Sequence, residues 1–204
     1  MHTPYRQPAL DRLYNGFFCD DVAMLLDGRA PATGWARLLT QEPCDPAALR
    51  ALATAAGTED RVAAMAWRRL QAAGHDVPRR ELFGVVIEVP LETGLDTLAA
   101  YRDGSVRYIH GSGHTSLVEG PVDSMLPLVR QLFAASQAVV DRIGPTDAPR
   151  RAAPASGVRL SFIVSDGLYF GEGPMNALMS DGLAGPVLQA GVAILDRVTS
   201  MVVA

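Results

Sequence analysis

The stretch from Phe83 to Glu119 consists of short runs in which apolar and polar residues alternate, separated by turns that contain glycine. Alternation with a period of two is typical of strands that bury one face. An Asp-Gly pair between two such runs, here Asp103-Gly104, predicts a β-hairpin with a two-residue turn. Counting outward from that turn pairs Arg102 with Ser105, Tyr101 with Val106, Ala99 with Tyr108 and Thr97 with His110.

This register sorts the side chains of the hairpin into two faces. The more apolar face, on which we expect helices to pack, carries Leu95, Thr97, Ala99, Tyr101, Val106, Tyr108 and His110. The other face is mixed and carries Asp96, Leu98, Ala100, Arg102, Arg107 and Ile109. Because charged residues interrupt it, we expect the mixed face to be solvated or half covered by a partner chain.

Two long helices follow from apolar residues spaced three and four positions apart. They are predicted at about residues 123–143 and 185–202, and between them a second strand pair surrounds Asp166-Gly167. A strand at about 82–89 precedes the hairpin. These patterns predict an α+β fold, with a largely antiparallel sheet of about six strands in the order ββββαββα and both long helices on one face.

The first part of the chain is predicted to be helical. Asp45-Pro46 is an N-cap followed by a proline in the first turn, and it opens a helix that runs to about Gly57. A second short helix ends near Gly74, and shorter helices carrying aromatic residues are expected before residue 45. We therefore divide the chain into an N-terminal helical annex, 1–78, packed on an α+β sheet domain, 79–204.

Composition narrows the possible functions. The net charge of −4 argues against a nucleic-acid partner, and all 18 basic residues are arginine, a bias typical of a GC-rich bacterial genome. No run of 18 apolar residues and no secretory signal is present, so we expect no membrane partner and a cytoplasmic protein. The two cysteines give no disulfide framework or zinc signature. Asp20 and Asp21 should raise the pKa of Cys19 and weaken it as a nucleophile.

The segment 95–113 resembles a set of uncharacterised bacterial proteins. They share a core of Leu-Asp-x-Leu-Ala-Ala-Tyr, Asp-Gly, Arg-Tyr and Ser-Gly. The matching positions are Leu95, Asp96, Leu98, Ala99, Ala100, Tyr101, Asp103, Gly104, Arg107, Tyr108, Ser112 and Gly113. The resemblance covers under a fifth of the chain and implies no activity or catalytic residue.

One candidate site for chemistry is the segment His110-Gly-Ser-Gly-His114. If residues 111–113 form a hairpin loop, the two histidines face each other with Cβ atoms roughly 5 Å apart, close enough to share a metal ion. Zinc is the candidate metal, and it needs a third ligand, for which Asp96, Glu119 and Glu172 are the carboxylates considered. The same glycine-rich loop is also a candidate backbone nest for an anion, with Ser112 at its centre.

The other hypothesis for the function is binding to a protein. Arg102, Arg107, Tyr108 and Ser112 are the candidate interface or ligand residues, because arginine and aromatic side chains anchor interfaces. We expect a non-catalytic binding or scaffold protein that acts through a sheet face or edge, with a protein partner or a second copy of itself. The alternative is a metal- or anion-binding enzyme that uses the loop between His110 and His114.

Overall fold

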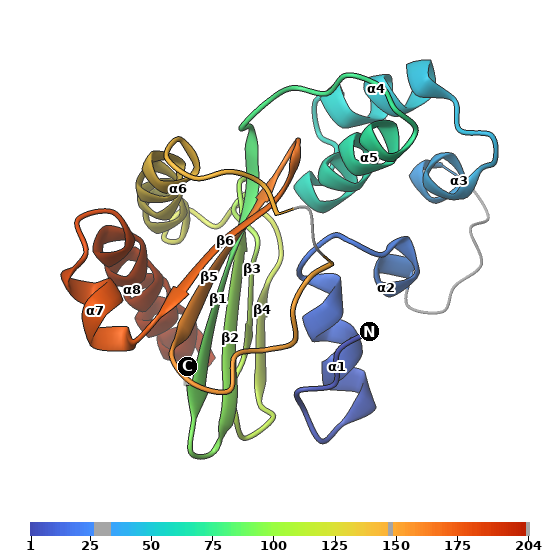
Figure 1. The fold of residues 1–204 in the computed structure, drawn as a ribbon. Helices are drawn as coiled ribbons and strands as arrows, with labels where there is room; N and C mark the ends of the chain where they lie inside the picture. Colours follow the sequence, from blue (N-terminus) through green and yellow to red (C-terminus); the bar gives the residue numbers. More distant parts are fainter. Residues whose placement is uncertain (27–33, 147–148, 203–204) are drawn as a thin grey trace.

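The structure is a computed structural model that describes residues 1–26, 34–146 and 149–202. Its centre is a six-stranded antiparallel sheet in the order β4-β3-β2-β1-β5-β6 (Figure 1). The strands are β1 (Leu82–Leu91), β2 (Gly94–Tyr101), β3 (Val106–Ile109), β4 (Thr115–Val118), β5 (Val158–Val164) and β6 (Gly167–Gly173). The predicted α+β class and the antiparallel sheet are confirmed.

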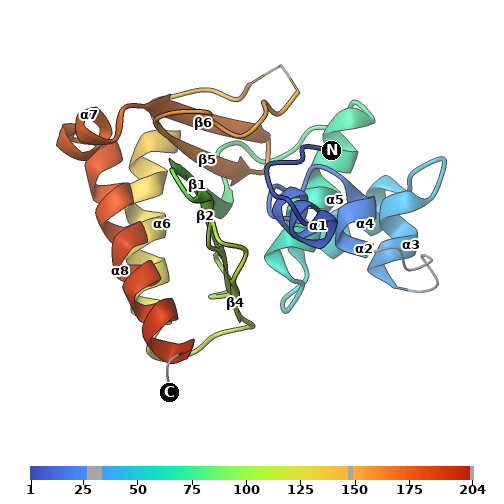
Figure 2. The same ribbon diagram turned by 90° about the horizontal axis from the view of Figure 1, so that it is seen from below.

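The two long helices lie side by side on one face of this sheet, as their single apolar stripes predict (Figure 2). They are α6 (Leu126–Val140) and α8 (Ala184–Val202). Gly191 of α8 allows the helix to approach β1, because a Cβ at this position would lie 2.4 Å from Cδ1 of Ile87. The short helix α7 (Met175–Ser180) lies in a glycine-containing stretch from which the sequence predicts only a loop.

Helices from the N-terminal part cover the opposite face of the sheet (Figures 1 and 2). They are α1 (Pro8–Gly16), α2 (Val22–Leu26), α3 (Trp35–Thr40), α4 (Pro46–Thr54) and α5 (Asp60–Ala72). Phe17 and Phe18 share a fully buried cluster with Phe83 and Tyr101 of the sheet. We refer to residues 1–26 and 34–72 as the helical layer. The face expected to be solvated or covered by a partner is not a single face: its residues Leu98 and Ala100 pack toward α6 and α8, whereas Ile109 lies under the helical layer.

The β2–β3 hairpin forms at the predicted place but with a different turn. Tyr101 N donates to Ser105 O at 2.9 Å, and Gly104 N donates to Tyr101 O at 2.9 Å. The loop therefore has three residues, 102–104, with Gly104 at a φ of +90°, a common hairpin type whose last loop position favours glycine. The β5–β6 hairpin does have a two-residue turn, but Val164 pairs with Gly167, so the turn is Ser165-Asp166.

The extra loop residue shifts the β2–β3 register by one. The pairs are Thr97 with Ile109, Leu98 with Tyr108, Ala99 with Arg107 and Ala100 with Val106. A one-residue shift moves every side chain of one strand to the other face. Val106 and Tyr108 consequently pack toward α6 and α8, whereas Arg107 and Ile109 lie on the face covered by the helical layer.

Gly104 gives a test of this hairpin. A Cβ at this position would lie 2.9 Å from Cδ2 of Leu126 and 3.3 Å from Cα of Pro121, at a φ that non-glycine residues rarely adopt. We expect Gly104→Ala to lower the free energy of unfolding by about 1–3 kcal/mol, measured by urea denaturation. Gly144→Ala, where a Cβ meets nothing within 4 Å, is the matched control and should change it little. Equal effects of the two substitutions would contradict the three-residue loop.

Candidate functional site

The hairpin tip brings the two predicted histidines and Ser112 together. His110 N donates to His114 O at 2.8 Å, so residues 111–113 form the expected loop. The hydroxyl of Ser112 lies 2.7 Å from Nδ1 of each histidine. Because Nδ1 of His110 also accepts the backbone N–H of Ser112 at 3.1 Å, this nitrogen is an acceptor. Ser112 therefore donates its proton to His110 and accepts from Nδ1–H of His114.

The carboxylates considered as further metal ligands are bound elsewhere. Asp96 accepts from Gly111 N and from the Tyr108 hydroxyl, each at 2.7 Å, and so holds the tip against β2. Glu119 pairs with Arg107, and Glu172 pairs with Arg159. In the part of the chain that the structure describes, no group of three or more His, Cys, Asp or Glu side chains could hold a metal ion. The tip offers two imidazoles, one short of the protein ligands of a catalytic zinc site.

Two of the four candidate interface residues are buried and two are exposed. Arg107 is 3% exposed and packs under the helical layer, where its guanidinium pairs with Glu119 and lies over the ring of Tyr101. Tyr108 is 5% exposed and packs toward α6 and α8. Arg102, which is bound by Asp60 and Glu81, and Ser112 are exposed. A protein contact through a sheet face would require the helices on that face to move away, so these two residues and the edge strands β4 and β6 remain for that hypothesis.

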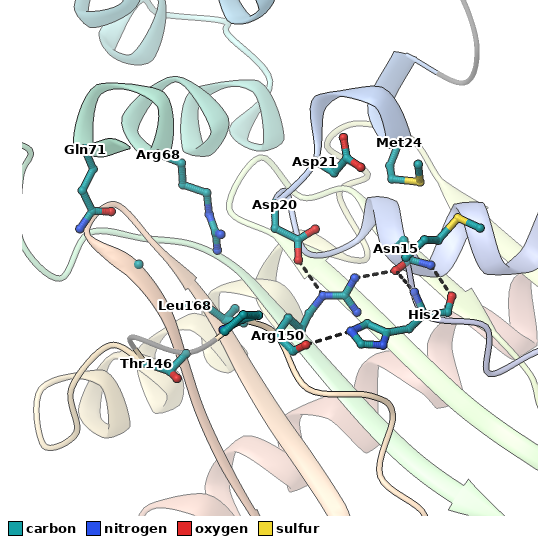
Figure 3. Close-up of a pocket in the computed structure, with 13 residues that line it drawn as sticks. His2, Asn15, Asp20, Asp21, Met24, Arg68, Gln71, Thr146, Arg150 and Leu168 are labelled. Atoms are coloured by element: carbon teal, nitrogen blue, oxygen red, sulfur yellow. Dashed lines mark hydrogen bonds and ion pairs between the residues drawn. The ribbon is translucent and has the colours of Figure 1, made fainter. Parts of the chain in front are cut away.

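A pocket of about 460 Å³ lies where the helical layer meets the β6 end of the sheet (Figure 3). Segments that are far apart in the sequence form its walls. Asn15, Asp20, Asp21 and Met24 come from α1, α2 and the connection between them; Arg68 and Gln71 come from α5; Thr146, Pro149 and Arg150 come from the connection after α6; and Leu168 comes from β6. His2 completes the wall. We call this cavity the seam pocket.

Arg150 is held firmly in the seam pocket. Its Nε donates to Oδ2 of Asp20 at 2.7 Å, and its Nη2 donates to Oδ1 of Asn15 at 2.6 Å. The guanidinium also lies 4.0 Å from the centroid of the Phe18 ring, a cation–π distance. The backbone carbonyl of Arg150 accepts from His2 Nε2 at 2.9 Å. These contacts fix one cation at the wall before any ligand arrives.

Arg68 has no comparable partners. Its side chain extends from α5 toward the space between Asp20 and Leu168 (Figure 3). Nε and Nη2 of Arg68 are out of contact with solvent and have no hydrogen-bond partner. No carboxylate of the described residues lies within ion-pair distance of this guanidinium, and burial lowers its pKa, an effect that Asp20 opposes and Arg150 adds to. The pocket therefore has a cation with two unsatisfied hydrogen-bond donors and a charge that Asp20 compensates only in part.

A buried polar layer lies under α1, next to the pocket. Glu88 of β1 is fully buried, and its Oε1 accepts from the Tyr14 hydroxyl at 2.8 Å. Its Oε2 lies 3.8 Å from Nη1 of Arg159. Burial raises the pKa of Glu88, although the bond from Tyr14 and the charge of Arg159 oppose that rise. A buried carboxylate thus links the helical layer to the sheet.

Cys19 has a raised thiol pKa, as expected, but the main cause is different. The residue is buried, and burial raises its pKa to about 12. Arg61 and Arg68 lower it, and Asp20 raises it by a smaller amount than burial does. A thiol in this state is not a nucleophile near neutral pH.

The sequence reasoning missed the seam pocket. Arg68 lies on the polar side of a predicted helix and Arg150 in a proline-rich connection, so neither pattern suggests a site. The one available signal is the aromatic pair Phe17-Phe18 followed by Cys19-Asp20-Asp21, in which apolar residues run directly into acidic ones. Such a junction is expected where a buried segment reaches a polar cavity.

Comparisons of the chain with family models, with curated proteins and with solved structures gave no match. None of the helices in residues 1–26, 34–146 and 149–202 combines the length and apolar character needed to cross a membrane. The function is therefore argued from the geometry of the residues themselves.

The raised pKa of Glu88 predicts a pH dependence of stability. Below its ordinary pKa of 4.5 the carboxyl is protonated in both the folded and the unfolded chain, so it adds no pH dependence to the free energy of unfolding. As the pH rises toward the higher folded-state pKa, the unfolded chain loses this proton first, so the free energy of unfolding falls by up to about 1.4 kcal/mol per pH unit. We expect Glu88→Gln to remove this slope, measured by urea denaturation from pH 4 to pH 8.

The matched control is Glu92→Gln, at the exposed turn between β1 and β2. Its unfolding free energy should follow that of the unchanged protein at every pH, because all other titrating groups are shared. If the curve for Glu88→Gln also runs parallel to that of the unchanged protein, the carboxyl is not protonated preferentially in the folded state.

Proposed function

We propose that this chain is a non-catalytic protein that binds a small molecule in the seam pocket. The observation that carries the proposal is the convergence of His2, Asn15, Asp20, Arg68 and Arg150, from separate segments, on one concave site. The volume of about 460 Å³ is within the range of small-molecule sites. The sequence also favours a binding protein, but one whose binding surface is a face or an edge of the sheet.

The chemistry of the lining supports binding over catalysis. The side chains of Asn15, Gln71, Arg68 and Arg150 donate hydrogen bonds but do not form covalent bonds with substrates. The Cys19 thiol nearby is buried, with a pKa of about 12. The His2 ring is held by the carbonyl of Arg150 through one of its nitrogens. Because Asn15 and Arg150 donate to protein groups, the unsatisfied donors of Arg68 are the ones that would orient a ligand, as a few polar groups do in a binding site.

The location of the pocket supports a role in which the ligand stabilises the fold. The ligand would contact the helical layer, the connection that carries Arg150 and strand β6 together. A molecule that binds only the folded state raises stability by about 2.7 kcal/mol at 100 times its dissociation constant. For a chain of this size that corresponds to a rise in the melting temperature of about 5–10 °C.

A thermal-shift screen tests this function. The panel contains neutral sugars, nucleosides, amino acids, organic acids and organic phosphates, each at several concentrations. We expect at least one compound to raise the melting temperature in a saturable way. Gln71→Trp, which places an indole at the exposed rim of the pocket, should abolish that rise.

The matched control is Arg50→Trp, which adds the same indole to the exposed surface of α4. This variant should bind as the unchanged protein does. The proposal fails if no compound binds, or if the bound compound is retained with unchanged affinity by Gln71→Trp.

A further inference from the structure

We propose that the ligand of the seam pocket carries an oxyanion, a carboxylate or phosphate group, and that Arg68 binds it; this inference rests on the proposed function. Nε and Nη2 lie along one edge of the planar guanidinium. That edge matches two oxygens of a carboxylate or phosphate, which is the geometry of a bidentate pair. Both nitrogens lack an acceptor in the protein, and an oxyanion at this edge would supply one to each.

The cost of leaving Arg68 in this state favours an anionic ligand. Burial takes hydration from the charged side chain of Arg68, and the attraction of Asp20 offsets only part of that loss. Arg150 increases the cost, because its positive charge acts on Arg68 and lowers the pKa of that guanidinium. An oxyanion between the two arginines would compensate the charge of Arg68, because Asp20 is already paired with Arg150. A neutral ligand would not compensate the charge of Arg68.

One oxygen of each aspartate at the pocket already accepts a hydrogen bond from the protein. Oδ2 of Asp20 accepts from Nε of Arg150 at 2.7 Å. Oδ1 of Asp21 accepts from Ala23 N at 2.8 Å, within its own turn. The Asn15 amide oxygen accepts from His2 N and from Arg150. Neither aspartate accepts a hydrogen bond from Nε or Nη2 of Arg68, which is left with unmet hydrogen-bonding capacity.

A change of the Arg68 rotamer toward a ligand would break no hydrogen bond, because its guanidinium makes none with another described residue. Arg150, in contrast, is fixed by Asp20, Asn15 and Phe18. The two arginines would therefore play different roles. Arg150 supplies a fixed positive potential, and Arg68 makes the direct bidentate contact.

Calorimetric titration tests this assignment. The probes are inorganic phosphate and succinate, with glycerol 3-phosphate compared against glycerol, all at one ionic strength maintained with sodium chloride. We expect the oxyanion probes to bind and glycerol not to bind. The relative strengths of phosphate and succinate then identify which oxyanion the site prefers.

Arg68→Gln should weaken oxyanion binding at least tenfold, and it should not lower the melting temperature of the ligand-free protein, because it removes a charge that Asp20 compensates only in part. Arg68→Lys is the second variant; it keeps the charge, lacks the planar edge and should also bind more weakly. Arg130→Gln, on the exposed surface of α6, is the matched control and should bind normally. Equal binding by Arg68→Gln and the unchanged protein would overturn the assignment.

The results also separate this inference from the proposed function. If a neutral compound of the screen binds and is blocked by Gln71→Trp, whereas phosphate and succinate act no differently from chloride, the pocket binds a ligand but the oxyanion assignment is wrong. If neither the screen nor these probes give binding, both proposals fail.

Discussion

The sheet of this protein has two apolar faces, and both must be buried away from water for the fold to be stable. Helices α6 and α8 bury one face. The other carries Phe83, Val86, Tyr101 and Ile109, each with no exposed surface, and the N-terminal helices cover it. The helical layer is therefore part of the main core, and its removal would expose large aromatic and aliphatic side chains. The seam pocket lies at the boundary between this layer and the β6 end of the sheet.

Polar side chains also join the helical layer to the sheet. Glu88 lies under α1 and is bound by Tyr14, and Arg150 is held by Asn15 and Asp20 of the helical layer. A buried carboxylate and a half-buried guanidinium are unfavourable without partners. These pairs consequently specify where α1 sits on the sheet. The position of α1 in turn places Asn15 and Asp20 at the wall of the pocket, opposite Arg68 of α5. The same contacts thus serve both the fold and the candidate site.

The sequence predicts the elements of this fold better than their contacts. The apolar stripes of α6 and α8 and the alternation of β1 to β3 are strong periodic signals, and the structure confirms these elements. The turn at Gly104 was placed correctly, but two-residue and three-residue loops both accept Asp-Gly, so the register and the facing of Arg107 were wrong. The hairpin tip was predictable, because His110 and His114 lie within one loop. Arg68 and Arg150 are brought together only by tertiary packing, for which no local pattern exists.

Both tryptophans, Trp35 and Trp67, lie in the helical layer, so tryptophan fluorescence reports on this layer alone. Far-UV circular dichroism reports on the whole chain, including the sheet, α6 and α8. Urea unfolding followed by both signals therefore tests most directly whether the layer and the sheet share one core. We expect the two transitions to coincide in midpoint and slope, as for a single cooperative unit. A fluorescence transition that is complete before most of the circular dichroism is lost would contradict this view.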